Sequence, residues 1–151
     1  MDVNCALDRQ AAHCRLTSMP DPHASRILIV EDEESLRNVL QTTLEQEGYS
    51  VATASDGGEA LRHLRSSERP DLILLDLVMP GVDGMAFRRE QRWDPERGEI
   101  PVIVVSAIAP EPDELRALAA ADYLTKPFDM HRLLEVVARH CPPPARAAVR
   151  S

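Results

Sequence analysis

Two short runs of apolar residues, LILL at 72–75 and VIVV at 102–105, constrain the fold more than any other feature of this sequence. Successive side chains of a strand point to opposite faces of its sheet, so a strand that is apolar at every position has both faces buried. Parallel sheets that carry helices on both faces bury their strands in this way. We therefore expect buried, parallel strands at 71–76 and 101–107.

From residue 26 onward, strand-like and helix-like segments alternate along the whole chain. Strands are expected at 26–30, 50–54, 71–76, 101–107 and 122–126. Helices are expected at 34–48, 57–67, 83–93, 112–121 and 130–140, where apolar residues recur at helical spacing. Alternation of this kind predicts an α/β sandwich with right-handed crossovers around a parallel sheet.

The first expected helix shows the helical spacing most clearly. Five residues recur there at helical spacing: Leu36, Val39, Leu40, Thr43 and Leu44. Gly48 follows as a plausible end of the helix.

A single domain is expected between residues 26 and 141. The chain of 151 residues is 44% hydrophobic and 28% charged, which is ordinary for one globular domain. Residues 1–25 lack sustained periodicity, and residues 142–151 are rich in proline, so both are expected to be unstructured tails.

Cellular location follows from what the sequence lacks. The longest purely apolar runs are far too short to cross a bilayer, and residues 1–25 lack the basic and apolar regions of a signal peptide. The three cysteines stand at irregular positions and suggest no disulfide framework. We expect a cytoplasmic protein with no membrane contact.

The charge pattern argues against direct binding to nucleic acid. The net charge is −8, and the acidic excess lies between residues 26 and 141. Aromatic residues make up only 3% of the chain, and no basic stripe is interleaved with them. We expect the partners to be proteins.

The N-terminal tail raises two further questions. It holds Cys5, His13, Cys14 and His23, which are zinc-binding residue types, but their spacing matches no zinc finger. An unstructured tail is therefore favoured over a zinc site. Met19 is a plausible alternative start of translation.

Polar side chains stand at the carboxyl end of four of the expected strands. Glu31 and Asp32 follow the first strand, Asp76 ends the third, Ser106 closes the fourth and Lys126 closes the fifth. Ligand sites of open α/β sheets lie at this edge. The acids at 31–34 could instead stabilise a helix N-terminus, and Lys126 could be a surface ion-pair partner. The functional interpretation is favoured because Asp76 follows a buried run and needs a cation or donor.

Magnesium-assisted phosphoryl transfer suits these residue types. Carboxylates are the ligands that a hard divalent cation prefers, and a carboxylate can also act as the nucleophile and become an acyl phosphate. Lys126, the only lysine of the chain, offers a compact ammonium that can contact one phosphoryl oxygen. A hydroxyl group can donate to another oxygen.

These residues stand within longer motifs: ILIVEDEE, DLILLDLVMPGVDG, PVIVVSA and DYLTKPF. In their order and spacing, they resemble the receiver domain of two-component response regulators, over about residues 26–141. The resemblance implies a flavodoxin-like fold, a three-layer (βα)5 sandwich with a five-stranded parallel sheet in the order 2-1-3-4-5. It also implies that the Lys126–Pro127 peptide is often cis.

The resemblance further implies a role for each polar residue at the strand ends. Asp76 would be the phospho-acceptor, and Lys126 and Ser106 would assist the transfer. Ser106 and Tyr123 would be the switch residues. Mg²⁺, or Mn²⁺ in its place, would be held by Glu31, Asp32, Asp76 and the backbone carbonyl of Val78.

The implied function is a signalling switch, not an enzyme beyond its own phosphorylation and slow dephosphorylation. A sensor histidine kinase or a histidine phosphotransfer protein would donate the phosphoryl group. A partner would then read the face formed by residues 112–121, 122–126 and 130–140, since no output domain is expected after residue 141. A homodimer through this face is left open.

Two alternatives and two departures from the family pattern remain. An aspartate-nucleophile phosphatase would carry a second acid two positions after Asp76, where Val78 stands. A degenerate receiver that only binds partners is disfavoured because all five site side chains are present. The customary glycine before the fifth strand is replaced, apparently by Ala119, and the segment from Ser106 to Lys126 is slightly shorter than usual.

Overall fold

The computed structural model describes residues 25–66, 69–77, 84–107 and 111–143. Its centre is a five-stranded sheet in the order β2-β1-β3-β4-β5, and all four pairs of neighbouring strands are parallel. The expected α/β sandwich and strand order are confirmed. Among the described residues, no helix is long and apolar enough to cross a bilayer.

The strands are β1 (Arg26–Val30), β2 (Ser50–Ala54), β3 (Leu72–Asp76), β4 (Val102–Ser106) and β5 (Asp122–Thr125). The helices are α3 (Glu34–Gln46), α4 (Gly57–Ser66), α5 (Gly84–Trp93), α6 (Pro112–Leu118) and α7 (Met130–His140).

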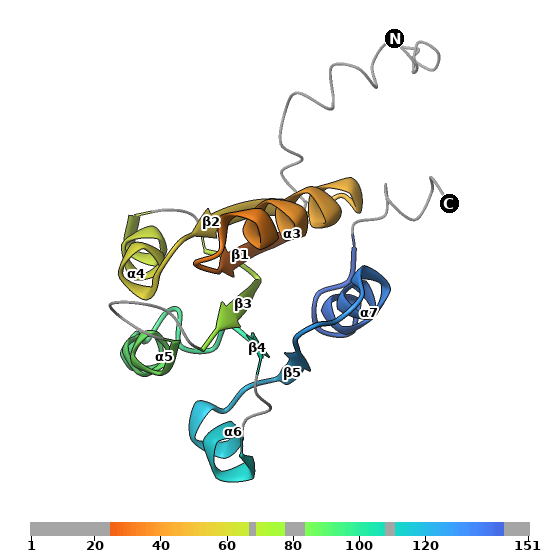
Figure 1. Cartoon of the computed structure of the whole chain (residues 1–151). Coiled ribbons are helices and arrows are strands. Elements are labelled where there is room, and N and C mark those ends of the chain that lie inside the picture. The colour runs from red at the N-terminus through yellow and green to blue at the C-terminus, as the bar shows by residue number, and fades with distance from the viewer. Residues whose placement is uncertain (1–24, 67–68, 78–83, 108–110, 144–151) are drawn as a thin grey trace, which may run out of the picture.

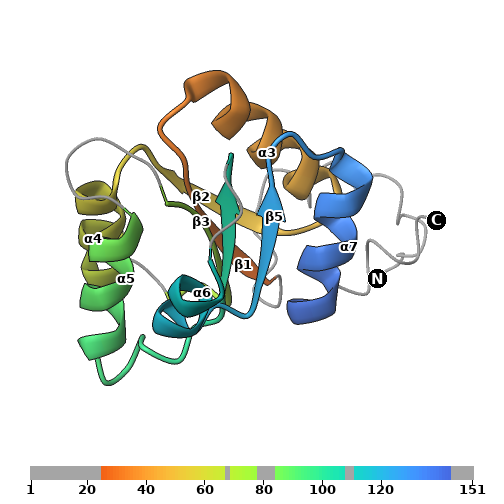
Figure 2. The same cartoon turned by 60° about the horizontal axis from the view of Figure 1, so that its bottom comes forward.

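Helices cover both faces of the sheet. Figure 1 shows α3 and α7 on one side of the strands and α4 and α5 on the other, and Figure 2 shows the same layers from another direction. Every residue of β3 and β4 is buried, whereas the edge strands β2 and β5 are partly exposed. The apolar runs at 72–75 and 102–105 thus lie in two of the three inner strands of the sheet.

The sheet separates two hydrophobic cores, because alternate residues of each strand face opposite layers. In the first core, Ile27, Ile29 and Leu74 of the sheet pack with residues of α3 and α7. In the second, Leu28 and Ile73 pack with residues of α4, α5 and α6. The helical residues of the two cores include Leu40, Leu44, Leu133, Val136 and Val137 in the first, and Ala60, Leu64, Phe87 and Leu118 in the second.

The ends of α3 and α7 follow from local sequence. Gly48 lies just beyond α3 with a φ of 99°, a left-handed conformation that glycine adopts without strain. The carboxylate of Asp129 caps α7 by accepting a hydrogen bond of 2.7 Å from the backbone N–H of Arg132. Within the helical stripe of α3, Leu40 and Leu44 are buried against the sheet, whereas Val39 lies at the margin of the stripe and is 47% exposed.

Several sequence expectations concern residues outside the described part of the chain. The tail residues Cys5, His13, Cys14 and His23 are among them, as is Met19. Cys141 is described and belongs to the first core, where its side chain is buried and its backbone carbonyl accepts a hydrogen bond from the Tyr49 hydroxyl.

The corner between α6 and β5 contains the departure from the family pattern. Ala119 caps α6 in the left-handed region, with a φ of 52° and a ψ of 41°. A side chain with a Cβ is strained by roughly 1–2 kcal/mol in this conformation. The expected replacement of a glycine by Ala119 therefore falls at a position whose backbone favours glycine.

The start of α5 contains a close backbone approach. The N–H of Gly84 donates a hydrogen bond to the carbonyl of Leu77. A Cβ at position 84 would lie 2.6 Å from the carbonyl oxygen of Asp76 and 2.6 Å from the Cα of Leu77. Only glycine fits here without moving the backbone that follows β3.

Replacing Ala119 by glycine should stabilise the protein. Ala119→Gly removes the strain of the left-handed conformation, and we expect a gain of about 1 kcal/mol in the free energy of unfolding after the larger entropy of the unfolded chain is subtracted. Urea denaturation measures the change. As a control, Ala138→Gly in the interior of α7 should lose about 1 kcal/mol. A loss of stability in Ala119→Gly would contradict the assigned strain.

Replacing Gly84 by alanine should destabilise the protein. The added methyl group must displace backbone atoms rather than the end of a flexible side chain, so we expect Gly84→Ala to lower the free energy of unfolding by roughly 1–3 kcal/mol. The same urea denaturation gives the comparison. Wild-type stability in this variant would show that the segment after β3 relaxes freely.

Candidate functional site

The carboxyl edge of the sheet brings the predicted site residues together. Glu31 directly follows β1, Asp76 and Ser106 are the last residues of β3 and β4, and Lys126 directly follows β5. The parallel register places these strand ends side by side. Glu31, Asp76 and Ser106 are only 2%, 5% and 3% exposed, so the site contains two carboxyl groups that are almost fully removed from water.

The ammonium group of Lys126 lies between these two buried carboxylates. Its Nζ is 3.0 Å from Oε1 of Glu31 and 3.3 Å from Oδ2 of Asp76. Lys126 thus supplies the cation that a carboxylate at the end of a buried strand requires. The shorter contact, with Glu31, is not indicated by the sequence, in which Glu31 is a candidate metal ligand or an acid at a helix N-terminus.

The pKa values of Lys126 and Glu31 are both raised at this site. Burial alone would lower the pKa of Lys126, but the hydrogen bond and charge of Glu31, together with the charge of Asp76, raise it above its usual value. Burial raises the pKa of Glu31, and the hydrogen bonds from Lys126 and from the Glu33 N–H only partly offset that rise. Lys126 is therefore held as a cation at neutral pH, with its charge directed at the carboxylates.

The acidic residues could also hold a metal ion. Glu31, Asp32 and Asp76 each offer a carboxylate oxygen, and these oxygens lie within 4.8 Å of one another. Asp32 is exposed, so the cluster is open to solvent on one side. An all-oxygen set with an open side fits a small hard cation that keeps part of its water shell. Val78, whose carbonyl was expected to be a further ligand, lies outside the described residues.

Arg37 holds the acidic loop in place, a contribution that sequence reasoning missed. Its Nη1 donates to the backbone carbonyl of Glu31 at 2.9 Å and to that of Asp32 at 3.4 Å. The N–H of Glu31 donates to the carbonyl of Ala54 at 3.0 Å. An arginine in the first turns of a helix that follows an acidic loop is the sequence signal that could have indicated this role.

Gly84 is the second residue that sequence reasoning missed. It is the last residue of the DLILLDLVMPGVDG motif, in which its role is not apparent from the sequence. Because its Cα lies against the backbone of Asp76 and Leu77, it sets how closely α5 approaches the end of β3. A glycine at the first position of a helix, shortly after the acidic strand end, was the available signal.

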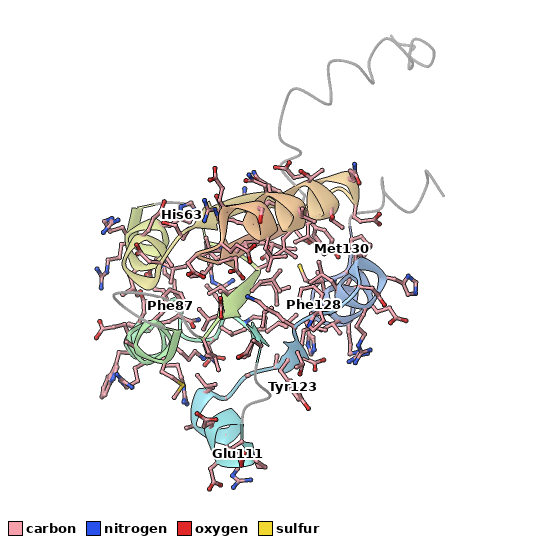
Figure 3. The ribbon with its side chains drawn as sticks, in the orientation of Figure 1. His63, Phe87, Glu111, Tyr123, Phe128 and Met130 are labelled. Atoms are coloured by element: carbon pink, nitrogen blue, oxygen red, sulfur yellow. The ribbon has the colours of Figure 1, made fainter. Side chains whose placement is uncertain are left out.

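The two expected switch residues lie at different depths. Ser106 is buried at the end of β4, and its backbone carbonyl accepts a hydrogen bond from the N–H of Lys126 at 2.8 Å. Tyr123 is 41% exposed, and its side chain points outward from β5 (Figure 3). The Lys126–Pro127 peptide is cis, as expected.

Comparisons with known proteins agree with this arrangement. The model of the response regulator receiver domain family matches residues 27–138. The alkaline phosphatase synthesis transcriptional regulatory protein SphR of Synechococcus elongatus is 41% identical over 121 residues, which are 74% of this chain and 46% of that protein. The chain spans less than half the length of the curated relatives that it matches first.

Solved structures show the same likeness. The chemotaxis protein CheY4 of Vibrio cholerae superposes with a TM-score of 0.72 at 31% identity, over 78% of this chain and 98% of that one. The response regulator protein TrrA of Thermotoga maritima, solved in complex with Mg²⁺-BeF, gives a TM-score of 0.67 at 35% identity, over 76% of this chain and 97% of that one. The chain therefore belongs to the response regulator receiver domain family, the flavodoxin-like signalling switches of two-component systems.

Proposed function

We propose that this protein is a phosphorylation-dependent switch in which Asp76 accepts a phosphoryl group from a phosphohistidine. The donor is a sensor histidine kinase or a histidine phosphotransfer protein. The observation that carries the proposal is the ammonium of Lys126, placed 3.3 Å from the carboxylate of Asp76 at the open edge of the sheet. A cation at that position can neutralise charge on an incoming phosphoryl group.

Mg²⁺ fits the acidic cluster, with Mn²⁺ as a substitute. Glu31, Asp32 and Asp76 would hold it, and the carbonyl of Val78 is proposed as a further ligand. When bound, the ion offsets the repulsion between the acids and the anionic phosphoryl group. Arg37 contributes by fixing the backbone of the loop that carries Glu31 and Asp32.

The transfer itself uses the side chains of this chain. A carboxylate oxygen of Asp76 forms a bond to phosphorus while the bond from phosphorus to the donor histidine nitrogen breaks, and the electron pair stays on that nitrogen. Lys126 contacts one phosphoryl oxygen, and the Ser106 hydroxyl donates a hydrogen bond to another. Hydrolysis of the acyl phosphate by water later resets the switch.

The signal leaves the site through the face formed by α6, β5 and α7. Ser106 moves toward the phosphoryl group, and Tyr123 turns inward from its exposed position into the space that opens. This motion repacks the outer face of β5, which a partner protein reads. The driving force is a local change of charge that biases two arrangements of one element.

The assignment of Asp76 can be tested by mass spectrometry. After incubation with Mg²⁺ and acetyl phosphate, we expect the wild-type protein to gain the mass of one phosphoryl group and Asp76→Asn to gain none. Chelation of the metal should suppress the reaction. Asp113→Asn, at an exposed position of α6, serves as the matched control and should be phosphorylated normally. Absence of any gain in the wild type would favour a binding module that takes no phosphate.

The need for an ammonium at position 126 can be tested separately. Lys126→Arg keeps the charge, but a planar guanidinium cannot sit between Glu31 and Asp76 as a compact ammonium does. We expect phosphorylation by acetyl phosphate to slow by about tenfold or more. The NMR shifts of Ser106 and Tyr123 should change less on phosphorylation than in the wild type. Wild-type rates and shifts in this variant would make the lysine incidental.

A further inference from the structure

A groove of about 510 Å³ lies between α5 and α6, away from the carboxyl edge of the sheet. Helix α5 supplies one wall, and the C-terminal residues of α6, Ala117 and Leu118, supply the other. Met85, Arg89 and Arg92 recur at helical spacing of four and three residues, so they share one face of α5. The Asp76 switch uses none of these side chains.

The apolar part of the groove is centred on Trp93. This side chain is 83% exposed and is the only tryptophan of the chain. Met85 is partly buried at the other end of the same helix. Tryptophan, methionine and arginine are the residue types most enriched where proteins bind one another, and a large exposed indole loses unfavourable contact with water when a partner covers it.

The polar part of the groove consists of arginines. Arg88, Arg89 and Arg92 line it, and in the described part of the chain no acidic residue does, although the net charge of the chain is −8. The guanidinium of Arg88 is buried and donates to the backbone carbonyls of Leu118 and Ala119 at 2.7 and 3.0 Å. Burial and the nearby charge of Arg92 lower the pKa of Arg88 to about 10.

The outer two arginines remain available to a ligand. Arg92 is exposed and donates to the carbonyl of Ala117 at 3.1 Å through one of its nitrogens. Arg89 is exposed, and among the described residues no carboxylate or carbonyl pairs with it. The groove therefore offers the N–H donors and the positive charge of Arg89 and Arg92, and the described residues place no carboxylate beside them.

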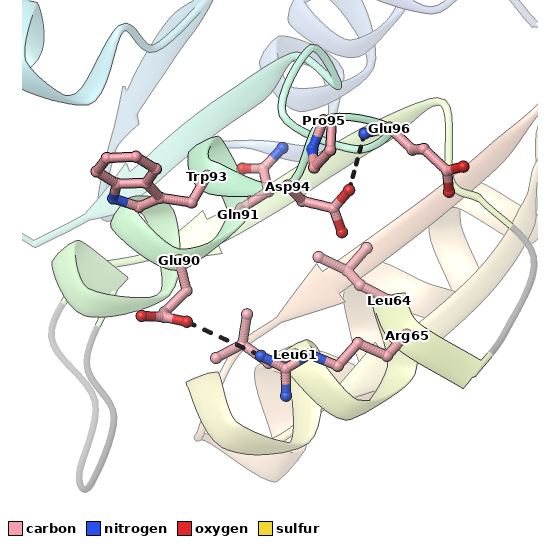
Figure 4. A pocket seen from close by; sticks show the side chains of 9 residues that line it. All are labelled: Leu61, Leu64, Arg65, Glu90, Gln91, Trp93, Asp94, Pro95 and Glu96. Atoms are coloured by element: carbon pink, nitrogen blue, oxygen red, sulfur yellow. Dashed lines mark hydrogen bonds and ion pairs between the residues drawn. The ribbon is translucent and has the colours of Figure 1, made fainter.

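A second hollow, on the other side of Trp93, provides the contrast. It measures about 390 Å³ and lies between α4 and α5 (Figure 4). Its acids already have partners: Glu90 pairs with Arg65 at 3.8 Å, and Asp94 accepts from the N–H of Glu96 at 2.8 Å. Of the two surfaces beside Trp93, the α5–α6 groove is therefore the one whose charged side chains have no carboxylate partner among the described residues.

We propose that the α5–α6 groove docks an acidic segment of a partner protein. Carboxylates of the segment meet Arg89 and Arg92, and an apolar side chain between them packs against Trp93 and Met85. The occupant is assigned by charge complementarity, since a basic or neutral segment would leave the guanidinium groups unpaired. The groove adjoins the α6–β5–α7 face and shares the C-terminal residues of α6 with it, but its arginines and Trp93 belong to α5. The proposal does not depend on phosphorylation of Asp76.

Trp93 lines both hollows, and it is the only tryptophan of the chain, so its emission reports on binding beside it and the variants below assign the binding to one hollow. The probe is a short peptide of aspartates and glutamates around a central phenylalanine, titrated into the full chain without phosphoryl donor. We expect a saturable blue shift of the emission that weakens as salt is added. The same peptide with asparagine and glutamine in place of the acids should bind about tenfold more weakly, as should one with alanine in place of phenylalanine.

Variants of the protein locate the effect. Arg89→Glu reverses an exposed charge and should weaken binding about tenfold, while Arg89→Lys should largely restore it. Arg132→Glu makes the same change of charge at another exposed arginine, on α7 and outside the groove, and as the control it should bind as the wild type does. Circular dichroism verifies that each variant is folded.

Three outcomes would overturn the proposal. The first is no change in Trp93 emission on titration with the acidic peptide. The second is equal binding of the neutral peptide, or equal binding by Arg89→Glu, which would remove the role of charge. The third is a blue shift that grows with protein concentration in the absence of peptide, together with dimers in sedimentation, which would assign the groove to a second copy of this chain.

Discussion

The structure of the site depends on one cation held among acids. Glu31 and Asp76 are both almost fully buried, and two carboxylates at such a depth would repel each other and lack solvation. The ammonium of Lys126 compensates both at once, at 3.0 and 3.3 Å. This arrangement joins the ends of β1, β3 and β5 through charge, in addition to the hydrogen bonds of the sheet. It also keeps acids at the rim, where a metal ion and a phosphoryl group can reach them.

The fold and the position of the candidate site could both be predicted from the apolar runs of the sequence. Apolar runs without alternation indicate parallel strands, and the carboxyl ends of parallel strands share an edge. Which of two neighbouring acids is buried and pairs with Lys126 could not be predicted. Glu31 and Asp32 are adjacent and chemically alike, yet Glu31 is buried against Lys126 and Asp32 is exposed. That difference arises from the path of the loop, which Arg37 fixes from the next helix through hydrogen bonds to two backbone carbonyls. The position of Arg37 in the sequence could indicate such a contact, but not which of the two acids it leaves buried.

The second core contains another feature that could not be predicted from the sequence. Hydrophobic spacing places Phe87 and Leu118 in it, but spacing does not indicate that Arg88 is buried beside them. The buried arginine is tolerated because the backbone carbonyls at the end of α6 and the side chain of Gln91 accept its hydrogen bonds. Those carbonyls are available because α6 ends at Ala119 in a left-handed conformation. Two unusual features, a buried guanidinium and a strained alanine, thus support each other.

The way in which α6 is attached has a consequence for motion. One apolar side chain of this helix, Leu118, is buried in the second core. Hydrogen bonds from Arg88 and Arg92 to the carbonyls of Ala117, Leu118 and Ala119 hold the same C-terminal end. A displacement of α6 that keeps these contacts therefore pivots the helix about its C-terminal end.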